Sequence, residues 1–169
     1  MSFDIWLERY HKGEPSPFKR EVFETIFLPF CSNRDEYASD PNFMQVEYPD
    51  GGRADIYMSN LSNEVLEAAT KKAGGLVPPE EIGAVLEKAK GDPAFIQHVT
   101  FNHSGGKAFS EDMYKLAHRT GSVISWPDPN PIFVYTDEAV LKELPEPFSK
   151  TRKRLVRSGA DISEAIRTS

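Results

Sequence analysis

Hydrophobic and polar residues alternate along several short segments of the chain, beginning with SFDIWLERY at 2–10. Alternation with a period of two is typical of a strand that buries only one face. One side of this strand would carry Phe3, Ile5 and Leu7. The other side would carry Asp4, Trp6, Glu8 and Tyr10. The pattern therefore predicts a half-buried strand at the start of the chain.

The next segment changes to a helical period. Ser16 and Pro17 are residue types favoured at a helix N-cap and at the first helical position. Apolar residues then recur every four positions, at Phe18, Val22, Ile26 and Phe30, and are widened into a stripe by Phe23 and Phe27. The spacing predicts an amphipathic helix that ends near Pro29.

A hairpin and an inserted helical pair follow. The apolar segments 43–48 and 53–58 flank Pro-Asp-Gly-Gly, which is a strong hairpin signal. Between 60 and 90, Ser62 is expected to cap a first helix, Gly74-Gly75 to end it and Pro78-Pro79 to begin a second. We expect these residues to form a helical hairpin inserted into a fold based on a sheet.

The second half of the chain returns to strands. Residues 95–103 alternate, Ser110 is expected to cap a helix ending at Gly121, and strands are expected at 122–126 and 132–135. A short helix is expected from Asp137 to Leu144. This order predicts an α+β fold, with a mostly antiparallel mixed sheet, helices packed on one face and an inserted helical hairpin. The expected organisation is one domain over 1–149, with the helical insertion at 60–90, and a basic C-terminal tail at 150–169.

Charge and composition narrow the classes of function. The net charge of −6 disfavours binding to nucleic acid or to anionic membranes, both of which need a basic surface. No apolar run is long enough for a signal peptide or a membrane span, so a cytoplasmic location is expected. Residues 150–169 carry a net charge of +4 and the preceding residues −10. The tail is expected to fold back onto the acidic body, the alternative being a loose arm.

The segment FNHSGGKAFS at 101–110 resembles a phosphate-binding loop at first sight. A P-loop needs a glycine four residues before its Gly-Lys pair and a Ser or Thr after the lysine, whose hydroxyl coordinates magnesium. Asn102 and Ala108 stand at these positions. A chain reversal between strand 95–103 and the following helix explains the two glycines equally well. The segment is therefore interpreted as a turn.

Other catalytic or metal-binding patterns are weak, and no metal or cofactor is expected. By parity, His98 and His103 would lie on opposite faces of one strand and could not chelate together without a bend in it. The single cysteine, Cys31, excludes a disulfide within the chain and a cysteine-based zinc site, and its position after an apolar helix suits a buried thiol. Enzymatic activity thus has no supporting motif.

The outer side of the first strand and of the hairpin is the best candidate for a binding surface. Aromatic side chains among carboxylates are typical of protein-recognition sites, because they supply contact area at low entropic cost. The predicted binding residues are Trp6 and Tyr57, with Asp4, Glu8 and Asp55 around them. The alternative is that the inserted helices at 62–90 cover this side and make it a second core.

Three segments together resemble a widespread group of uncharacterised bacterial proteins. They are MSFDIWLERYHKGEPSPF, YPDGGRADIYM and KLAHRTGSVISWPDPNPIFVYTDEAVLKELP. The group has an MSFD start, a DGG hairpin, and a helix ending in RTG before a Trp-Pro strand and a closing TDEAVLxxLP helix. The resemblance spans about two-thirds of the chain and implies an immunity-type role beside toxin genes. It carries no functional residues over to this chain.

Two hypotheses of different classes follow. The first is a non-enzymatic protein-binding module that neutralises a basic partner such as a toxin domain, to which an acidic chain would be drawn rapidly. The second is a small-molecule enzyme or ligand-binding domain that uses His103, Lys107 and His118, with an anion at the helix start near Ser110. The carboxylates expected in the first turn of that helix would compete with such an anion.

Overall fold

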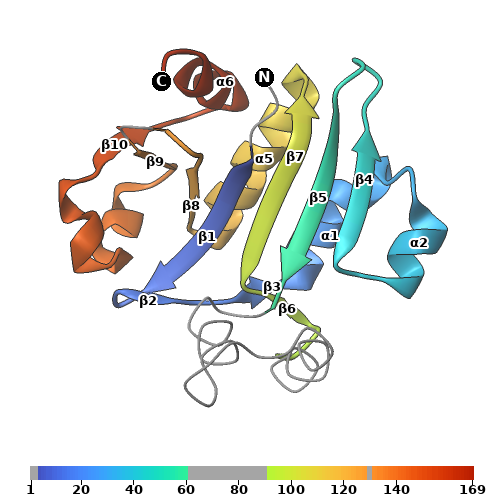
Figure 1. The fold of residues 1–169 in the computed structure, drawn as a ribbon, viewed down its shortest axis with the longest axis horizontal. Coiled ribbons are helices and arrows are strands. Elements are labelled where there is room, and N and C mark those ends of the chain that lie inside the picture. The colour runs from blue at the N-terminus through green and yellow to red at the C-terminus, as the bar shows by residue number, and fades with distance from the viewer. Residues whose placement is uncertain (1–3, 61–90, 129–130) are drawn as a thin grey trace, which may run out of the picture.

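A computed structural model describes residues 4–60, 91–128 and 131–169. Eight strands of the described residues form the main sheet, and seven of them follow the order β10-β9-β8-β1-β7-β5-β4, with β2 paired to β1 (Figure 1). All pairings in this sheet are antiparallel except β9 with β10, which is parallel. The strands are β1 (Ile5–His11), β2 (Glu14–Pro15), β4 (Phe43–Glu47), β5 (Arg53–Ser59), β7 (His98–Gly105), β8 (Ser122–Ser125), β9 (Ile132–Tyr135) and β10 (Arg152–Leu155). A separate pair joins β3 (Phe18–Lys19) to β6 (Phe95–Ile96).

Helices α1 (Arg20–Phe27) and α5 (Lys107–Thr120) lie on one face of the sheet, called the inner face below (Figure 1). Helix α6 (Gly159–Arg167) packs on α5, and the short helix α2 (Arg34–Ser39) lies beside β4. Three 3-10 helices complete the described elements: η1 (Leu28–Phe30), η2 (Glu138–Glu143) and η3 (Glu146–Lys150). The fold is therefore α+β with a mainly antiparallel sheet, as the sequence predicts.

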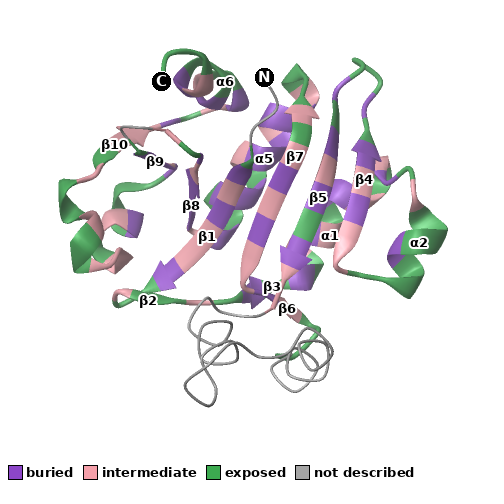
Figure 2. Ribbon diagram, in the orientation of Figure 1, coloured by how far each residue is buried: buried purple, intermediate pink, exposed green. Residues whose placement is uncertain are grey.

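The core lies between the inner face and the two helices. Leu7 of β1 and Phe101 of β7 have no exposed surface, and neither do Phe23 and Phe27 of α1. The rings of Phe27 and Phe101 lie 6.0 Å apart. Along the strands the buried and partly exposed residues alternate (Figure 2), as a sheet with one covered face requires. The predicted alternation in β1 is confirmed from Ile5 to Glu8, and it breaks at Tyr10, which is buried.

The first helix begins later than the pattern predicts. Phe18 and Lys19 pair with β6 in an extended conformation, so α1 starts only at Arg20. Ser16 does not cap it, and its hydroxyl instead accepts a 3.3 Å hydrogen bond from Arg9. Arg20 is buried and donates to the backbone carbonyls of Pro41 and Pro93, which ties two loops to the helix start.

The second long helix begins earlier than predicted. Its N-cap is Gly106, and Ser110 is buried inside the first turns, where its hydroxyl donates to the Gly106 carbonyl. The predicted Ser110 cap is therefore wrong. Asp112 then lies in the second turn, buried, where it accepts hydrogen bonds from Tyr48 at 2.9 Å and Lys115 at 2.7 Å. The predicted end at Gly121 is confirmed, since this residue is left-handed at φ 66°.

Residues 150–169, which are expected to fold back onto the acidic body as a basic tail, extend the same sheet. Strand β10 pairs with β9, and α6 buries Ile162 and Ala165. Ser158 caps α6 by accepting from the Asp161 amide. Much of the basic charge of this segment thus lies on an edge strand, where lysine and arginine side chains discourage pairing with another chain.

The helical insertion expected at 60–90 falls almost wholly outside the described residues, as does Phe3. None of the helices in the described part of the chain has the length and apolar content that a membrane crossing requires.

Candidate functional site on the outer sheet face

The outer face of the sheet lies opposite α1 and α5, and five strands place a continuous row of side chains across it. Backbone register aligns Tyr57 of β5 with Thr100 of β7, and Thr100 with Trp6 of β1. Phe43 of β4 continues the row at one end and Ser125 of β8 at the other. In register, these side chains point to the same face. Trp6 and Tyr57 are thus separated by a single residue, Thr100.

The aromatic members of this row differ in exposure. Tyr57 is 46% exposed, and it is the only large hydrophobic residue classed as exposed among the described ones. Its ring lies 4.9 Å from that of Phe43, which is half-buried. Trp6 is half-buried as well. The row therefore presents a partly exposed apolar ridge on an otherwise polar face.

A chain of hydrogen bonds runs beside the row. The Glu8 carboxylate accepts from Tyr10 at 2.8 Å and meets Nδ1 of His98 at 2.9 Å, while Nε2 of His98 lies 3.0 Å from the Thr100 hydroxyl. Burial acts to raise the pKa of Glu8, but the hydrogen bonds from His98 and Tyr10 outweigh burial and lower it. Glu8 is therefore an ionised, oriented carboxylate that fixes its neighbours.

A second carboxylate, Asp55, also has hydrogen-bond partners on neighbouring strands. It accepts from the Gln45 amide at 2.9 Å and lies 3.0 Å from Nδ1 of His103. The parity argument that placed His103 on the opposite face from His98 is wrong. Strand β7 has one extra residue against β5 here, and His103 adopts φ 49°, so this β-bulge turns its side chain toward Asp55.

The outer face is covered at one end. Tyr10, expected on the same open side as Trp6, is buried with Val123, Phe133 and Val140 beneath η2 and η3. Its ring meets Phe148 edge-on at 5.8 Å. Burial and the nearby Glu8 carboxylate raise the pKa of Tyr10. The candidate binding surface is thus limited to β4, β5, β7 and the first half of β1, with Asp4 exposed just before β1.

The Gly-Gly-Lys segment is a turn held by the DGG hairpin. Asp50 accepts hydrogen bonds from the Gly52 and Ala108 amides, both at 2.9 Å. The Ala108 amide lies in the first turn of α5, where N–H groups have no partner within the helix. These backbone hydrogen bonds lower the pKa of Asp50. Gly106 has φ 102°, and a side chain there would overlap the Gly52 backbone. The positive end of the helix is therefore already neutralised by a carboxylate of the protein itself.

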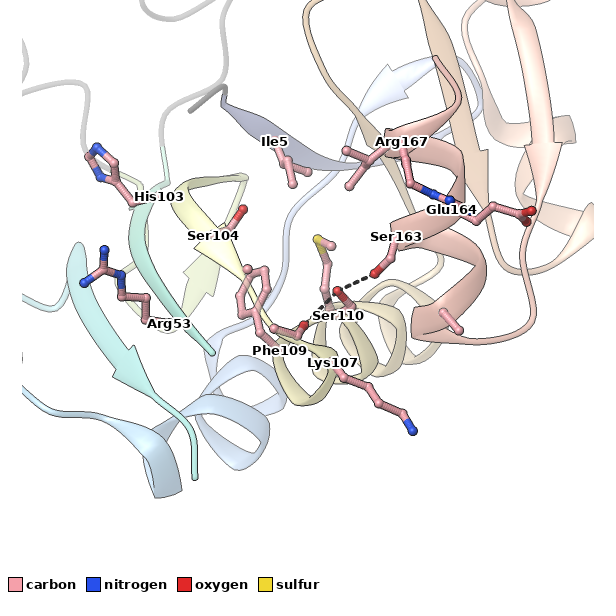
Figure 3. A pocket seen from close by; sticks show the side chains of 15 residues that line it. Ile5, Arg53, His103, Ser104, Lys107, Phe109, Ser110, Ser163, Glu164 and Arg167 are labelled. Atoms are coloured by element: carbon pink, nitrogen blue, oxygen red, sulfur yellow. Dashed lines mark hydrogen bonds between the residues drawn. The ribbon is translucent and has the colours of Figure 1, made fainter. Parts of the chain in front are cut away.

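The residues of the alternative site are only partly brought together. His103 and Lys107 border the same pocket (Figure 3). His118 lies eleven positions further along α5, roughly 16 Å away at the rise of an α-helix. It stacks there on Tyr114, with ring centroids 5.8 Å apart. Nowhere in the described residues do three or more His, Cys, Asp or Glu side chains gather as a metal site would need.

Sequence reasoning missed the partners that organise this face. Alternation in strand 95–103 would have placed His98 and Thr100 on the outer face. The hairpin would likewise have placed Phe43 there, because Phe43 lies opposite Tyr57. The role of Asp50 had no local signal, because it depends on the packing of the hairpin against the turn at 105–106.

Comparisons of the chain with known protein families, with characterised proteins and with solved structures find no match. A proposal of function therefore has to start from the geometry of the outer face.

Proposed function

We propose that the chain is a non-enzymatic protein-binding module that uses the outer face of its sheet. The observation that carries the proposal is the aromatic row, in which Tyr57 is exposed and Trp6 and Phe43 are half-buried on one face. Aromatic residues in such positions contribute much of the binding energy in protein interfaces. The hydrogen-bonded carboxylates beside the row hold this surface rigid, which reduces the entropic cost of binding.

The charge of the same face favours a basic partner. Its carboxylates are Asp4, Glu8, Glu47 and Asp55, against a single guanidinium from Arg53. The chain as a whole has a net charge of −6. Such a field accelerates association with a positively charged protein and repels acidic ones. The proposed partner is therefore a basic protein.

The resemblance to proteins encoded beside toxin genes suggests what this partner is. We propose an immunity-type role, in which the chain binds and neutralises a toxin domain with a basic cleft. The proposed location is the cytoplasm.

The test is affinity capture with the full tagged chain from a lysate of its native host, at low and high salt. A basic protein retained at low salt and released at high salt is the expected result. The captured protein is then purified, and its affinity is measured for the wild type and for Trp6→Ala and Tyr57→Ala. We expect each substitution to weaken binding about tenfold or more, as loss of a central aromatic anchor does.

Tyr114→Ala is the matched control, because Tyr114 is a half-buried aromatic on α5, away from the outer face. Its affinity for the partner should stay within about twofold of the wild type, as for residues outside an interface. Growth arrest by the partner alone, relieved by co-expression of this chain, would support the immunity role. Equal binding by Trp6→Ala, Tyr57→Ala and the wild type would contradict the proposal, as would retention of no protein at low salt.

A further inference from the structure

A pocket of about 890 Å³ lies at the end of the sheet, away from the aromatic row. It is bordered by the start of β1, the end of β7, the first turns of α5 and the face of α6 (Figure 3). Its volume falls within the roughly 300–1,000 Å³ of pockets that hold small molecules. Its lining comes from segments that are far apart in the sequence, so no local sequence pattern predicts this pocket.

The floor of this pocket is apolar. It consists of Ile5, Phe109, Met113 and Ile166, of which the first three are buried core residues. Two hydroxyls interrupt the floor: Ser163 donates to Ser110 at 2.8 Å, and Ser110 donates onward to the Gly106 carbonyl. An apolar body fits such a floor better than a sugar or a nucleotide, which would need many more polar contacts.

Three positively charged side chains, Arg53, Lys107 and Arg167, surround the pocket, in contrast to the acidic chain. His103 lies among them and meets the Asp55 carboxylate at 3.0 Å. Figure 3 shows the side chains of Arg53, His103 and Lys107 extending away from Ile5 and Phe109. The one carboxylate in the lining, Glu164, is bound to Arg154 at 2.6 Å.

The side chains of these three cations have no partner. Within the described residues, no hydrogen bond or ion pair involves the side chain of Arg53, Lys107 or Arg167, although acidic residues outnumber basic ones by 26 to 20 in the chain. Long side chains without partners can turn toward a bound anion, and guanidinium groups bind carboxylates and phosphates with two parallel hydrogen bonds. The helix start is not available for this purpose, because Asp50 occupies it.

We propose that this pocket binds a small amphipathic anion. Its apolar body packs on Ile5, Phe109 and Met113, and its carboxylate or phosphate is held by Arg53, Lys107 and Arg167 at the rim. The proposal is independent of the protein-binding function of the outer face, and either can fail without the other.

The test uses three probes with the same eight-carbon chain: octanoate, octyl phosphate and 1-octanol. Each is titrated into the ¹⁵N-labelled full chain, and amide shifts are followed by NMR. We expect both anions to shift the amides of Phe109, Ser110 and Ser163, and octanol to bind about tenfold more weakly, because it lacks the charge-assisted hydrogen bonds. A stronger response to octyl phosphate than to octanoate, or the reverse, identifies the preferred headgroup.

Two variants locate the site. The triple substitution of Arg53, Lys107 and Arg167 by Gln should weaken octanoate binding about tenfold, since each exposed charge contributes a modest share. Its matched control replaces the exposed Lys142, Lys150 and Arg152 by Gln, which removes the same charge elsewhere and should leave the affinity unchanged. The second variant is Ala160→Trp, at an exposed residue in the lining, which should block both anions without disturbing the core.

Four results would overturn the proposal. They are octanol binding as tightly as octanoate, equal loss of affinity in the two triple variants, amide shifts confined to residues outside the pocket, and no response to either anion.

Discussion

The two faces of the main sheet are made by the same strands, yet one face is buried against helices and the other carries polar and partly exposed side chains. On the inner face, Leu7 and Phe101 are fully buried against two helices, so stability comes from packing and the removal of apolar surface from water. On the outer face, Trp6 and Thr100 stand in register among carboxylates and histidines joined by hydrogen bonds. A shift of one residue would exchange the two faces, so the strand register that builds the core also determines which side chains are free to bind.

The sharpest way to test this comparison is to truncate one residue on each face. Leu7→Ala should lower the free energy of unfolding by about 2–5 kcal/mol, because it leaves a cavity in a closely packed core. Tyr57→Ala should lower it by less than about 1 kcal/mol, since the ring is 46% exposed. Urea unfolding followed by circular dichroism measures both.

The outcome that would contradict the comparison is a loss in Tyr57→Ala as large as that in Leu7→Ala. The outer face would then be a second core, and Tyr57 would contribute to stability and not to binding.

Two neighbouring glycines provide a second comparison. Gly106 has φ 102° and lies against the Gly52 backbone, whereas an alanine methyl group at Gly105 would meet nothing within 4 Å. Gly106→Ala should therefore cost about 1–3 kcal/mol from backbone strain, with a further cost from the overlap. Gly105→Ala should change stability by about 0.5 kcal/mol or less, as surface substitutions usually do.

Thermal unfolding of the two variants checks this prediction. Equal midpoints would show that the turn is not held against the DGG hairpin, and the start of α5 would then be open to an anion after all.

The sequence predicts most of this fold because its signals are local. Alternation in β1 and the DGG turn each specify an element through neighbouring residues, and both are found where expected. Helix starts were predicted less well. The start of α1 is set by pairing of Phe18 with Ile96, and that of α5 by Asp50, which comes from a hairpin more than fifty residues earlier.

In the candidate site, too, local signals predict the structure correctly and long-range contacts account for the errors. Strand parity alone placed Trp6, Glu8 and Tyr57 on one face. Parity failed for His103, because a bulge adds a residue to β7, and for Tyr10, because η3 brings Phe148 over it from a distant part of the chain. Long-range packing of this kind leaves no trace in the local pattern.

The smallest predicted effect concerns the ionisation of Glu8. Its folded pKa lies below the usual value of 4.5, so its contribution to stability is present above that value and is lost as the pH falls through the folded pKa. Between about pH 5 and pH 3, the wild type should therefore lose more stability than Glu8→Gln, by about 1 kcal/mol or less given the partial exposure of the carboxylate. Urea unfolding at a series of pH values measures the difference.

Glu47→Gln is the matched control, because Glu47 is an exposed carboxylate on the same face. The control should follow the wild-type pH dependence, whereas Glu8→Gln should flatten it. His98→Gln gives a further check, since it removes the ring that meets Glu8 at 2.9 Å while leaving the Tyr10 hydrogen bond in place. If Glu8→Gln retained the full pH dependence, Glu8 would be an ordinary surface carboxylate. The rigid polar support proposed for the aromatic row would then have no physical basis.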